Sequence, residues 1–455
     1  MSPLRPQRAA RSIPPLVPVT LLLFFAVFLA SLAPARSLDD LLHLAQRHDR
    51  QRQAELHSAT AGEYDGLQLI AAYGPSVTLT AKASDTRHHS KPNSEEYVES
   101  SANFREGEAL ITLEQPLVDL VKGSHLLRGM VEMDIAVLLR DKAELDLRLR
   151  VGERCYGFLG ARTAFDLAHK EGLALQQQAE NVATRLSLGF DTITSLHEAK
   201  ARQGLARAAT ISRRIELDNA AKALEELIGE ALGEDVDDLA PDFVPAAPGH
   251  TQQWWLEKAQ KGNSDLKIRR LQLEAAEYEY RAAQGQFLPS LAFYTSYRGR
   301  TSSDGLDGYG EDRDEFETGL RLDLQLLAGG RDTAAVLAAA NRVKAARARL
   351  EASDRDVERR LLSLWQSVEH TALLVSANRH AASENEEALK STLAAYDEGG
   401  KVLLDVLNAQ QNHYRSLGAY LNSRYDYMLL LERLRHAAGG EPPGEDTELT
   451  AAPQT

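Results

Sequence analysis

The chain carries the same pattern twice. The run Ser187-Leu188-Gly189 returns as Asp397-Glu398-Gly399, at an offset of 210 positions. Upstream, Gly74-Pro75-Ser76-Val77 is echoed by Leu288-Pro289-Ser290-Leu291. An internal repeat is the first feature to settle when a fold is inferred from sequence. The duplication therefore excludes most single-copy enzyme architectures before any catalytic motif is considered.

The N-terminus has the features of a secretory signal. Three arginines precede an apolar run from Leu16 to Leu32, and Ala33-Pro34-Ala35 supplies small residues for a cleavage site. This pattern predicts a signal peptide over residues 1–35. A transmembrane anchor is the alternative, but the run is at the short edge of the roughly 20 residues that span a bilayer.

The amino-acid composition excludes some classes of function but does not identify one. The 455 residues carry 52 basic and 66 acidic side chains, for a net charge of -14, and an acidic chain is a poor ligand for nucleic acid. The only cysteine, Cys155, lacks a disulfide partner in the chain and lies in a helical pattern, so we expect a buried thiol. Abundant Ala, Leu, Glu and Arg with 6% aromatic residues indicates long, packed helices.

Proline placement locates those helices. No proline lies between Pro116 and Pro241, or between Pro289 and Pro442, and apolar residues recur at helical spacing within both stretches. A helix from Leu120 to Leu186 would be about 100 Å long at 1.5 Å per residue. Glycines at 189 and at 399 to 400 interrupt the two stretches at matching places, which predicts one helical hairpin in each copy.

Before each long helix the apolar period changes from 3.6 to 2. The clearest example alternates Phe316, Thr318, Leu320, Leu322, Leu324 and Leu326 with charged or small residues. Val77 to Ala81, Ala109 to Leu113 and Leu291 to Tyr297 alternate in the same way. About ten residues with one apolar and one charged face fit a transmembrane β-strand, although half-buried strands of a soluble sandwich show the same alternation.

Four such strands in two hairpins cannot close a sheet alone. Because an open edge is forbidden in lipid, several protomers would have to contribute strands to one barrel. The polar, turn-rich segments Arg87 to Asn103 and Gly299 to Asp314 are expected as extracellular loops.

These residues together carry a family resemblance. Phe287-Leu288-Pro289-Ser290-Leu291, Leu326-Leu327-Ala328-Gly329-Gly330-Arg331, the run Leu404 to Gln410 and Arg424-Tyr425-Asp426-Tyr427 occur in the order and spacing of the TolC family of outer-membrane efflux proteins, which the chain resembles over nearly its whole mature length. The resemblance implies a homotrimer in the outer membrane of a Gram-negative bacterium, extending into the periplasm. Each protomer would give four strands to a twelve-stranded β-barrel and four helical strands to a coiled-coil tunnel.

The resemblance also implies partners and a division of the chain. A periplasmic adaptor (membrane fusion) protein would join the trimer to an inner-membrane RND, MFS or ABC transporter, for drug efflux or type I secretion. The expected divisions are a signal peptide (1–35), a first helical segment (36–75), a first β-hairpin (76–117), a first long helical hairpin (118–229), an equatorial linker (230–263), a second helical segment (264–289), a second β-hairpin (290–327), a second long helical hairpin (328–439) and a flexible C-terminal tail (440–455).

The same resemblance assigns a periplasmic gate. Asp405 and Asn408 are three residues apart and share one helix face, which in the family lines the closed entrance. Tyr396, Lys401, Thr194 and Ser195 occupy positions that latch neighbouring helix pairs, although Ser195 replaces the usual aspartate and Lys401 the usual arginine. An exposed i, i+4 bridge between Lys401 and Asp405 is the alternative to a latch.

The hairpin tips are the expected adaptor contacts. Leu188 and Gly189 form the first tip, and Glu398 and Gly399 form the second. The plainer interpretation is that both glycines only make turns.

Enzyme motifs are incomplete. Gly399-Gly400-Lys401 lacks the first glycine and the hydroxyl residue of a phosphate loop, and His197-Glu198 lacks the second histidine of a zinc helix. His88-His89 and the aspartates between 304 and 314 fit a solvated loop better than a metal site. We therefore expect a passive export duct that is not an enzyme and has no cofactor or metal. A secreted coiled-coil scaffold or adhesin without a pore is the alternative.

Overall fold

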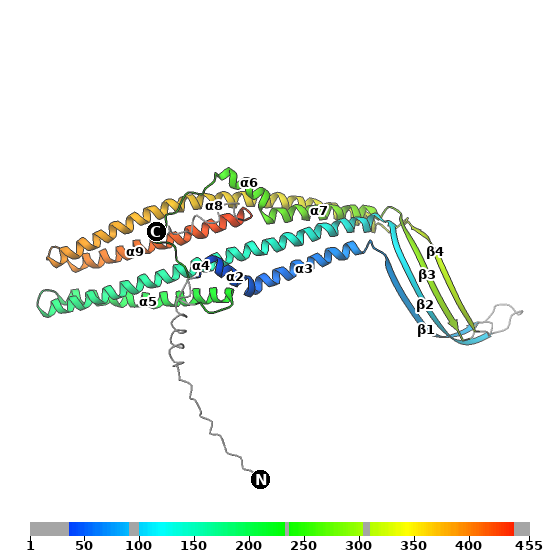
Figure 1. The fold of residues 1–455 in the computed structure, drawn as a ribbon, viewed down its shortest axis with the longest axis horizontal. Coiled ribbons are helices and arrows are strands. Elements are labelled where there is room, and N and C mark those ends of the chain that lie inside the picture. The colour runs from blue at the N-terminus through cyan, green and yellow to red at the C-terminus, as the bar shows by residue number, and fades with distance from the viewer. Residues whose placement is uncertain (1–35, 91–99, 233–235, 304–309, 441–455) are drawn as a thin grey trace, which may run out of the picture.

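The structure is a computed structural model that describes residues 36–90, 100–232, 236–303 and 310–440. The signal peptide predicted for residues 1–35 and nearly all of the tail predicted for 440–455 lie outside the described residues. Helices run side by side along one elongated body, and the strands form a sheet at one end of it (Figure 1). Both helical hairpin tips lie at the opposite end.

The elements follow one another in the order that the duplication predicts, with helix, strands and long helices in each half. Their bounds are α2 Leu38–His48, α3 Arg50–Ala71, β1 Ser76–Ser90, β2 Ser100–Val118, α4 Leu120–Ser187, α5 Ile193–Ile228, α6 Gln252–Gly262, α7 Ser264–Gly285, β3 Ser290–Ser302, β4 Glu311–Asp323, α8 Arg331–Asp397 and α9 Leu403–Ala437.

The helices α4 and α8 run unbroken through the body, with 68 and 67 residues. The Asp119 side chain accepts a hydrogen bond from the backbone of Lys122 and so satisfies a free N–H at the start of α4. Gly330 begins α8 with a φ of +85°, a conformation that glycine adopts without steric cost. No proline interrupts either helix, so the backbone ladder continues to the tips.

The partners of α4 and α8 are shorter helices that meet end to end near the middle of the body. At one junction the side chain of Asn263, which caps α7, donates to the carbonyl of Ala437 at the end of α9 (2.9 Å). There, a Cβ on Gly439 would lie 2.3 Å from the carbonyl carbon of Gly262. In the other half Gly229, at the end of α5, makes the equivalent approach to His48. Glycine at 229 and at 439 thus lets two helix ends touch.

The main hydrophobic core lies at these junctions. Buried side chains from α2, α4, α5, α6, α8 and α9 meet there, including Leu41, Leu147, Leu159, Ile228, Trp255, Leu361 and Leu434. The segment between α5 and α6 packs over this core, because Tyr425 donates to Asp238 (2.7 Å) and Tyr427 to the carbonyl of Ala246 (2.8 Å). Trp255 is 2% exposed and belongs to the packing, and Trp254 stacks on His250 with ring centroids 3.8 Å apart.

The strands form one antiparallel sheet in the order β1-β2-β3-β4, which leaves β1 and β4 as edges. The strands extend further into the expected loops than predicted, since pairing continues to Ser90↔Ser100 and to Ser302↔Glu311. At its other end β4 stops at Asp323, so Leu324 and Leu326, which the alternation assigned to this strand, lie outside it. Ion pairs on these extensions, such as Arg300 with Glu106, hold strands together beyond the apolar part.

The two faces of the sheet differ in chemistry. One face carries a row of exposed apolar side chains that includes Val77, Leu79, Ile111, Phe293, Tyr297, Phe316, Leu320 and Leu322. The other face carries cross-strand ion pairs, among them Arg321 with Glu114 (2.7 Å) and Arg298 with Glu315 (3.4 Å). The alternation predicted from the sequence therefore separates an apolar surface from a charged one.

Within the described ranges, no helix has a stretch of apolar residues long enough to cross a membrane.

The Cys155 thiol is buried in α4, as expected, and burial raises its pKa to about 12.

Candidate gate and hairpin tips

The first tip joins α4 to α5 in a tight turn. Gly189 has a φ of +80°, and the backbone N–H of Phe190 donates to the carbonyl of Arg185 (2.9 Å), which closes the end of α4. The Thr192 side chain then accepts from the backbone of Ser195 (3.1 Å) and caps the start of α5.

The second tip repeats this geometry with other side chains. Gly399 has a φ of +82°, and the N–H of Gly400 donates to the carbonyl of Ala395 (2.8 Å). The side chain of Asp405 lies 3.5 Å from the backbone nitrogen of Val402 at the start of α9. The structure therefore confirms two quasi-equivalent turns, as the offset of 210 predicted.

A small apolar cluster joins the two hairpins just inside the tips. It contains Leu175, Ala179 and Val182 of α4, Ala199 and Ala206 of α5, Tyr396 of α8, and Leu403, Val406 and Leu407 of α9. Each hairpin thus buries part of its apolar face against the other.

Tyr396 connects the hairpins through a polar contact as well. Its side chain is 7% exposed, and its hydroxyl donates a hydrogen bond of 3.0 Å to Asp191 in the first tip. The Arg185 guanidinium lies 3.9 Å from the same carboxylate and 4.8 Å from the centre of the Tyr396 ring. We call Arg185, Asp191 and Tyr396 the hairpin latch.

The latch shifts the titration of its members. Partial burial raises the pKa of Asp191, but hydrogen bonds from Ser195, Thr192 and Tyr396 outweigh burial and hold that pKa below its usual value. Burial, and then the bond to Asp191, raise the pKa of Tyr396. Both shifts favour a neutral phenol facing a charged carboxylate at neutral pH.

The residues predicted to form the latch therefore have different surroundings in the structure. Tyr396 takes part in a contact between hairpins, but its acceptor is Asp191 and not the residue at position 195. Ser195 contacts the latch through Asp191: its hydroxyl forms a hydrogen bond with the Asp191 carboxylate and lies 2.9 Å from the hydroxyl of Thr192. Thr194 is exposed on α5.

The second tip holds the remaining gate candidates. The Lys401 ammonium lies 3.7 Å from the Asp405 carboxylate, and these side chains are 51% and 41% exposed. This contact is the i, i+4 bridge that the sequence left open as the alternative. Asn408 follows one turn later with an exposed side chain, on the same face as Asp405.

The tip surfaces are chemically unlike each other. Leu188, Phe190 and Ile193 are 65%, 74% and 57% exposed at the first tip. Glu398, Gly399 and Lys401 are exposed at the second.

The sequence analysis did not single out Arg185, Asp191 or Phe190. Asp191 could have been noticed from the duplication, since it stands 210 positions before the gate candidate Lys401.

A helical body with paired hairpin tips at one end, and a sheet with one apolar and one charged face at the other, defines an outer-membrane channel protein. A family model described as outer membrane efflux protein matches residues 41–230 and 255–440, so the chain belongs to this family. The family consists of channels and not enzymes.

Curated relatives agree along most of the chain. The alkaline protease secretion protein AprF of Pseudomonas aeruginosa is 27% identical, with 94% of this chain and 89% of AprF covered. The outer membrane protein TolC of Vibrio cholerae is 25% identical, with 90% and 92% covered.

A solved structure has the same fold. The outer membrane protein VceC of Vibrio cholerae superposes with a TM-score of 0.74 at 19% identity, covering 89% of this chain and 96% of VceC. The predicted family, the mainly helical fold with a four-stranded antiparallel sheet, and the location in the outer membrane of a Gram-negative bacterium are confirmed. The chain is a channel for efflux or type I secretion.

Proposed function

We propose that the chain works as a homotrimer in which the sheets of three protomers close into one barrel of twelve strands. The observation that supports this assembly is the sheet itself. The strand order leaves β1 and β4 with free edges, while one face of the sheet carries a row of exposed apolar side chains. In a bilayer those edges have no water to satisfy them, so β4 of one protomer pairs with β1 of the next.

The same assembly gives a reason for the ion pairs on the other face of the sheet. Closing the sheet with its apolar side toward lipid places the ion pairs of Arg298, Arg300 and Arg321 inside the barrel, in contact with water. The lumen of the barrel is then lined by paired charges of both signs.

Native mass spectrometry of the detergent-extracted protein, combined with planar-bilayer recording, tests the assembly. A trimer that conducts ions is expected. A monomer without channel activity would refute the barrel and favour the scaffold or adhesin alternative.

The hairpin tips receive a periplasmic adaptor, which couples the channel to an inner-membrane transporter of the RND, MFS or ABC class. Supporting this are the exposed apolar side chains of the first tip, which would be unusual on a surface that meets only water. The names of the relatives AprF and PrtF refer to protease secretion, and that of BepC to efflux. Either use needs a duct joined to a pump.

The entrance is controlled by the hairpin latch and by a ring of Asp405. Threefold symmetry would bring three Asp405 carboxylates together just inside the tips, where a ring of negative charge attracts cations. The hydrogen bond from Tyr396 to Asp191 holds the second hairpin against the first, so its loss lets the hairpins separate. Lys401 weakens the field of the ring because its ammonium lies beside Asp405.

A further inference from the structure

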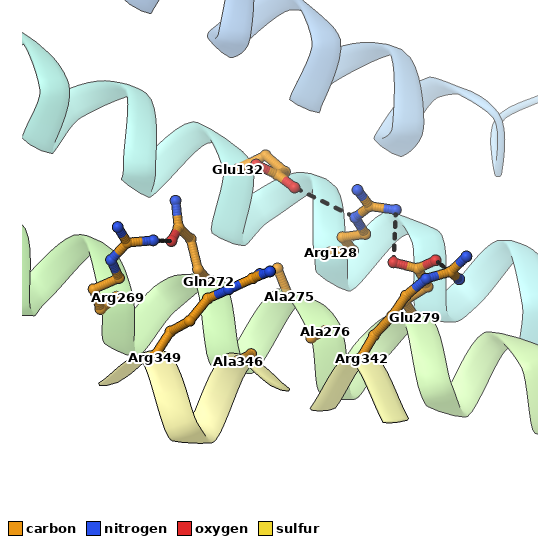
Figure 2. Close-up of a pocket in the computed structure, with 10 residues that line it drawn as sticks. All are labelled: Arg128, Glu132, Arg269, Gln272, Ala275, Ala276, Glu279, Arg342, Ala346 and Arg349. Atoms are coloured by element: carbon orange, nitrogen blue, oxygen red, sulfur yellow. Dashed lines mark hydrogen bonds and ion pairs between the residues drawn. The ribbon is translucent and has the colours of Figure 1, made fainter. Parts of the chain in front are cut away.

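A second site lies far from the gate, on the helical wall between the core and the sheet. A cavity of about 430 Å³ opens there between α4, α7 and α8 (Figure 2). Its charged lining consists of Arg128, Glu132, Arg269, Glu279, Arg342 and Arg349. The volume is within the range of small-molecule sites in proteins.

The carboxylates of the cavity are already engaged. Glu132 lies 3.3 Å from Arg128, and Glu279 lies 3.7 Å from Arg128 and 2.9 Å from Arg342. One glutamate therefore serves two guanidinium groups, and the cavity contains four guanidinium groups against two carboxylates.

The two remaining arginines have no acidic partner among the described residues. Arg269 donates only to the neutral side chain of Gln272 (3.0 Å), on its own helix. Figure 2 shows Arg349 extending from α8 toward Ala275 on α7, so unpaired guanidinium groups from two different helices line the cavity.

Small residues keep the cavity open. Ala275 and Ala276 of α7 and Ala346 of α8 line it without filling it. The lining carries four positive charges against two negative ones, and an anion inside the cavity would reduce the repulsion among the excess positive charges. Guanidinium groups present paired N–H donors that match the oxygens of a carboxylate or a phosphate.

We propose that this cavity binds a small multivalent oxyanion, bearing carboxylate or phosphate groups, between Arg269 and Arg349. The site is separate from the gate and from the tips, and all of its lining residues come from one protomer. Because both arginines are exposed, the anion enters from solvent and its affinity falls as salt screens the attraction.

Isothermal titration calorimetry on the full chain in detergent tests the proposal, with citrate and pyrophosphate as probes at low ionic strength. Citrate binding identifies carboxylate as the recognised group, and pyrophosphate binding identifies phosphate. In the double variant Arg269→Gln, Arg349→Gln the affinity should fall at least tenfold. The control is Arg347→Gln, which removes one positive charge from α8 outside the cavity lining and should change the affinity less than twofold.

A gain-of-binding variant protects the test against misfolding. Glu279→Gln removes the carboxylate that competes for Arg128 and Arg342, so the affinity should rise several-fold, which a damaged fold would not produce. Absence of binding by both probes would overturn the proposal. Equal losses in the double variant and in the Arg347 control, or no gain in Glu279→Gln, would overturn it as well.

Discussion

Asp191 and Lys401 occupy the same position in the two copies, 210 residues apart, yet they lie in opposite surroundings. The Asp191 side chain is 11% exposed and accepts from Tyr396 of the other hairpin, whereas Lys401 is 51% exposed and pairs with Asp405 of its own tip. The first tip thus supplies a contact between the hairpins, and the second tip carries an exposed ion pair. The two copies share one backbone geometry at the tips, but they differ in the side chains at positions 191 and 401.

Tyr396→Phe should loosen the entrance. The change removes a hydrogen bond to a carboxylate, a contact worth about 1.5–3 kcal/mol, and leaves the ring in the apolar cluster. We expect a higher open probability in planar bilayers with the trimer intact. Tyr420→Phe is the control, since the hydroxyl of Tyr420 on α9 makes no such contact within the described residues. An equal open probability in the two variants would show that the hairpin latch does not hold the gate.

The latch should also depend on pH. Because the pKa of Asp191 is lowered in the folded protein, its contribution is complete above the usual carboxyl range and is lost as the pH falls below about 4. The raised pKa of Tyr396 means that its contribution is complete below about pH 10 and is lost at higher pH. Single-channel recording should therefore show a stable entrance between these limits. The acid-side transition should be absent in Asp191→Asn, and its survival there would assign it to another group.

Bulky substitution at the tips should abolish export without unfolding the channel. Gly399 and Gly189 both have positive φ, and a Cβ at either would meet no atom within 4 Å. Gly399→Leu therefore adds local strain of roughly 1–2 kcal/mol and blocks only what approaches from outside. Gly330→Leu is a matched control, because Gly330 has the same φ and the same free space at the other end of α8. Secretion assays in cells should separate the two, and normal export by Gly399→Leu and Gly189→Leu would exclude docking at the tips.

Cation selectivity should respond to both charges of the second tip. Asp405→Ala should lower the preference for cations and weaken block by multivalent cations, whereas Lys401→Ala should raise both by removing the neighbouring ammonium. Reversal potentials in salt gradients measure the effect. Asp397→Ala, an exposed change in the same hairpin, should leave selectivity unchanged. If Asp405→Ala behaves like Asp397→Ala, the Asp405 carboxylate does not line the pore.

The helix junction should be more sensitive to a methyl group than the tips are. Gly439→Ala places a Cβ against the backbone of Gly262, while Gly399→Ala has nearly the same φ and free space around it. Thermal unfolding should show a melting temperature several degrees lower for Gly439→Ala than for Gly399→Ala, because the end of α9 has to move away from the end of α6. Equal melting temperatures would mean that the junction adapts without cost.

The sequence by itself determined the duplication, the hairpins and the faces of the strands. These features depend on local rules: proline is absent from the long helices, Gly189 and Gly399 make turns, and the period of two at Phe316 to Leu322 separates apolar from polar side chains. Such rules act between residues that are close in the chain, so one sequence is enough to read them.

Only the tertiary structure decided which residues meet across the copies. Asp191 replaces position 195 as the acceptor for Tyr396, Gly439 meets Gly262, and Arg269 and Arg349 converge on one cavity. These pairs are separated by tens to hundreds of residues, and side-chain packing between helices sets their distances. A shift of one helix turn, about 5.4 Å, would break each of them without changing the local pattern. The duplicated pattern of strands and helical hairpins therefore follows from the chain's periodicities, while the latch and the oxyanion cavity follow from how the helices are packed.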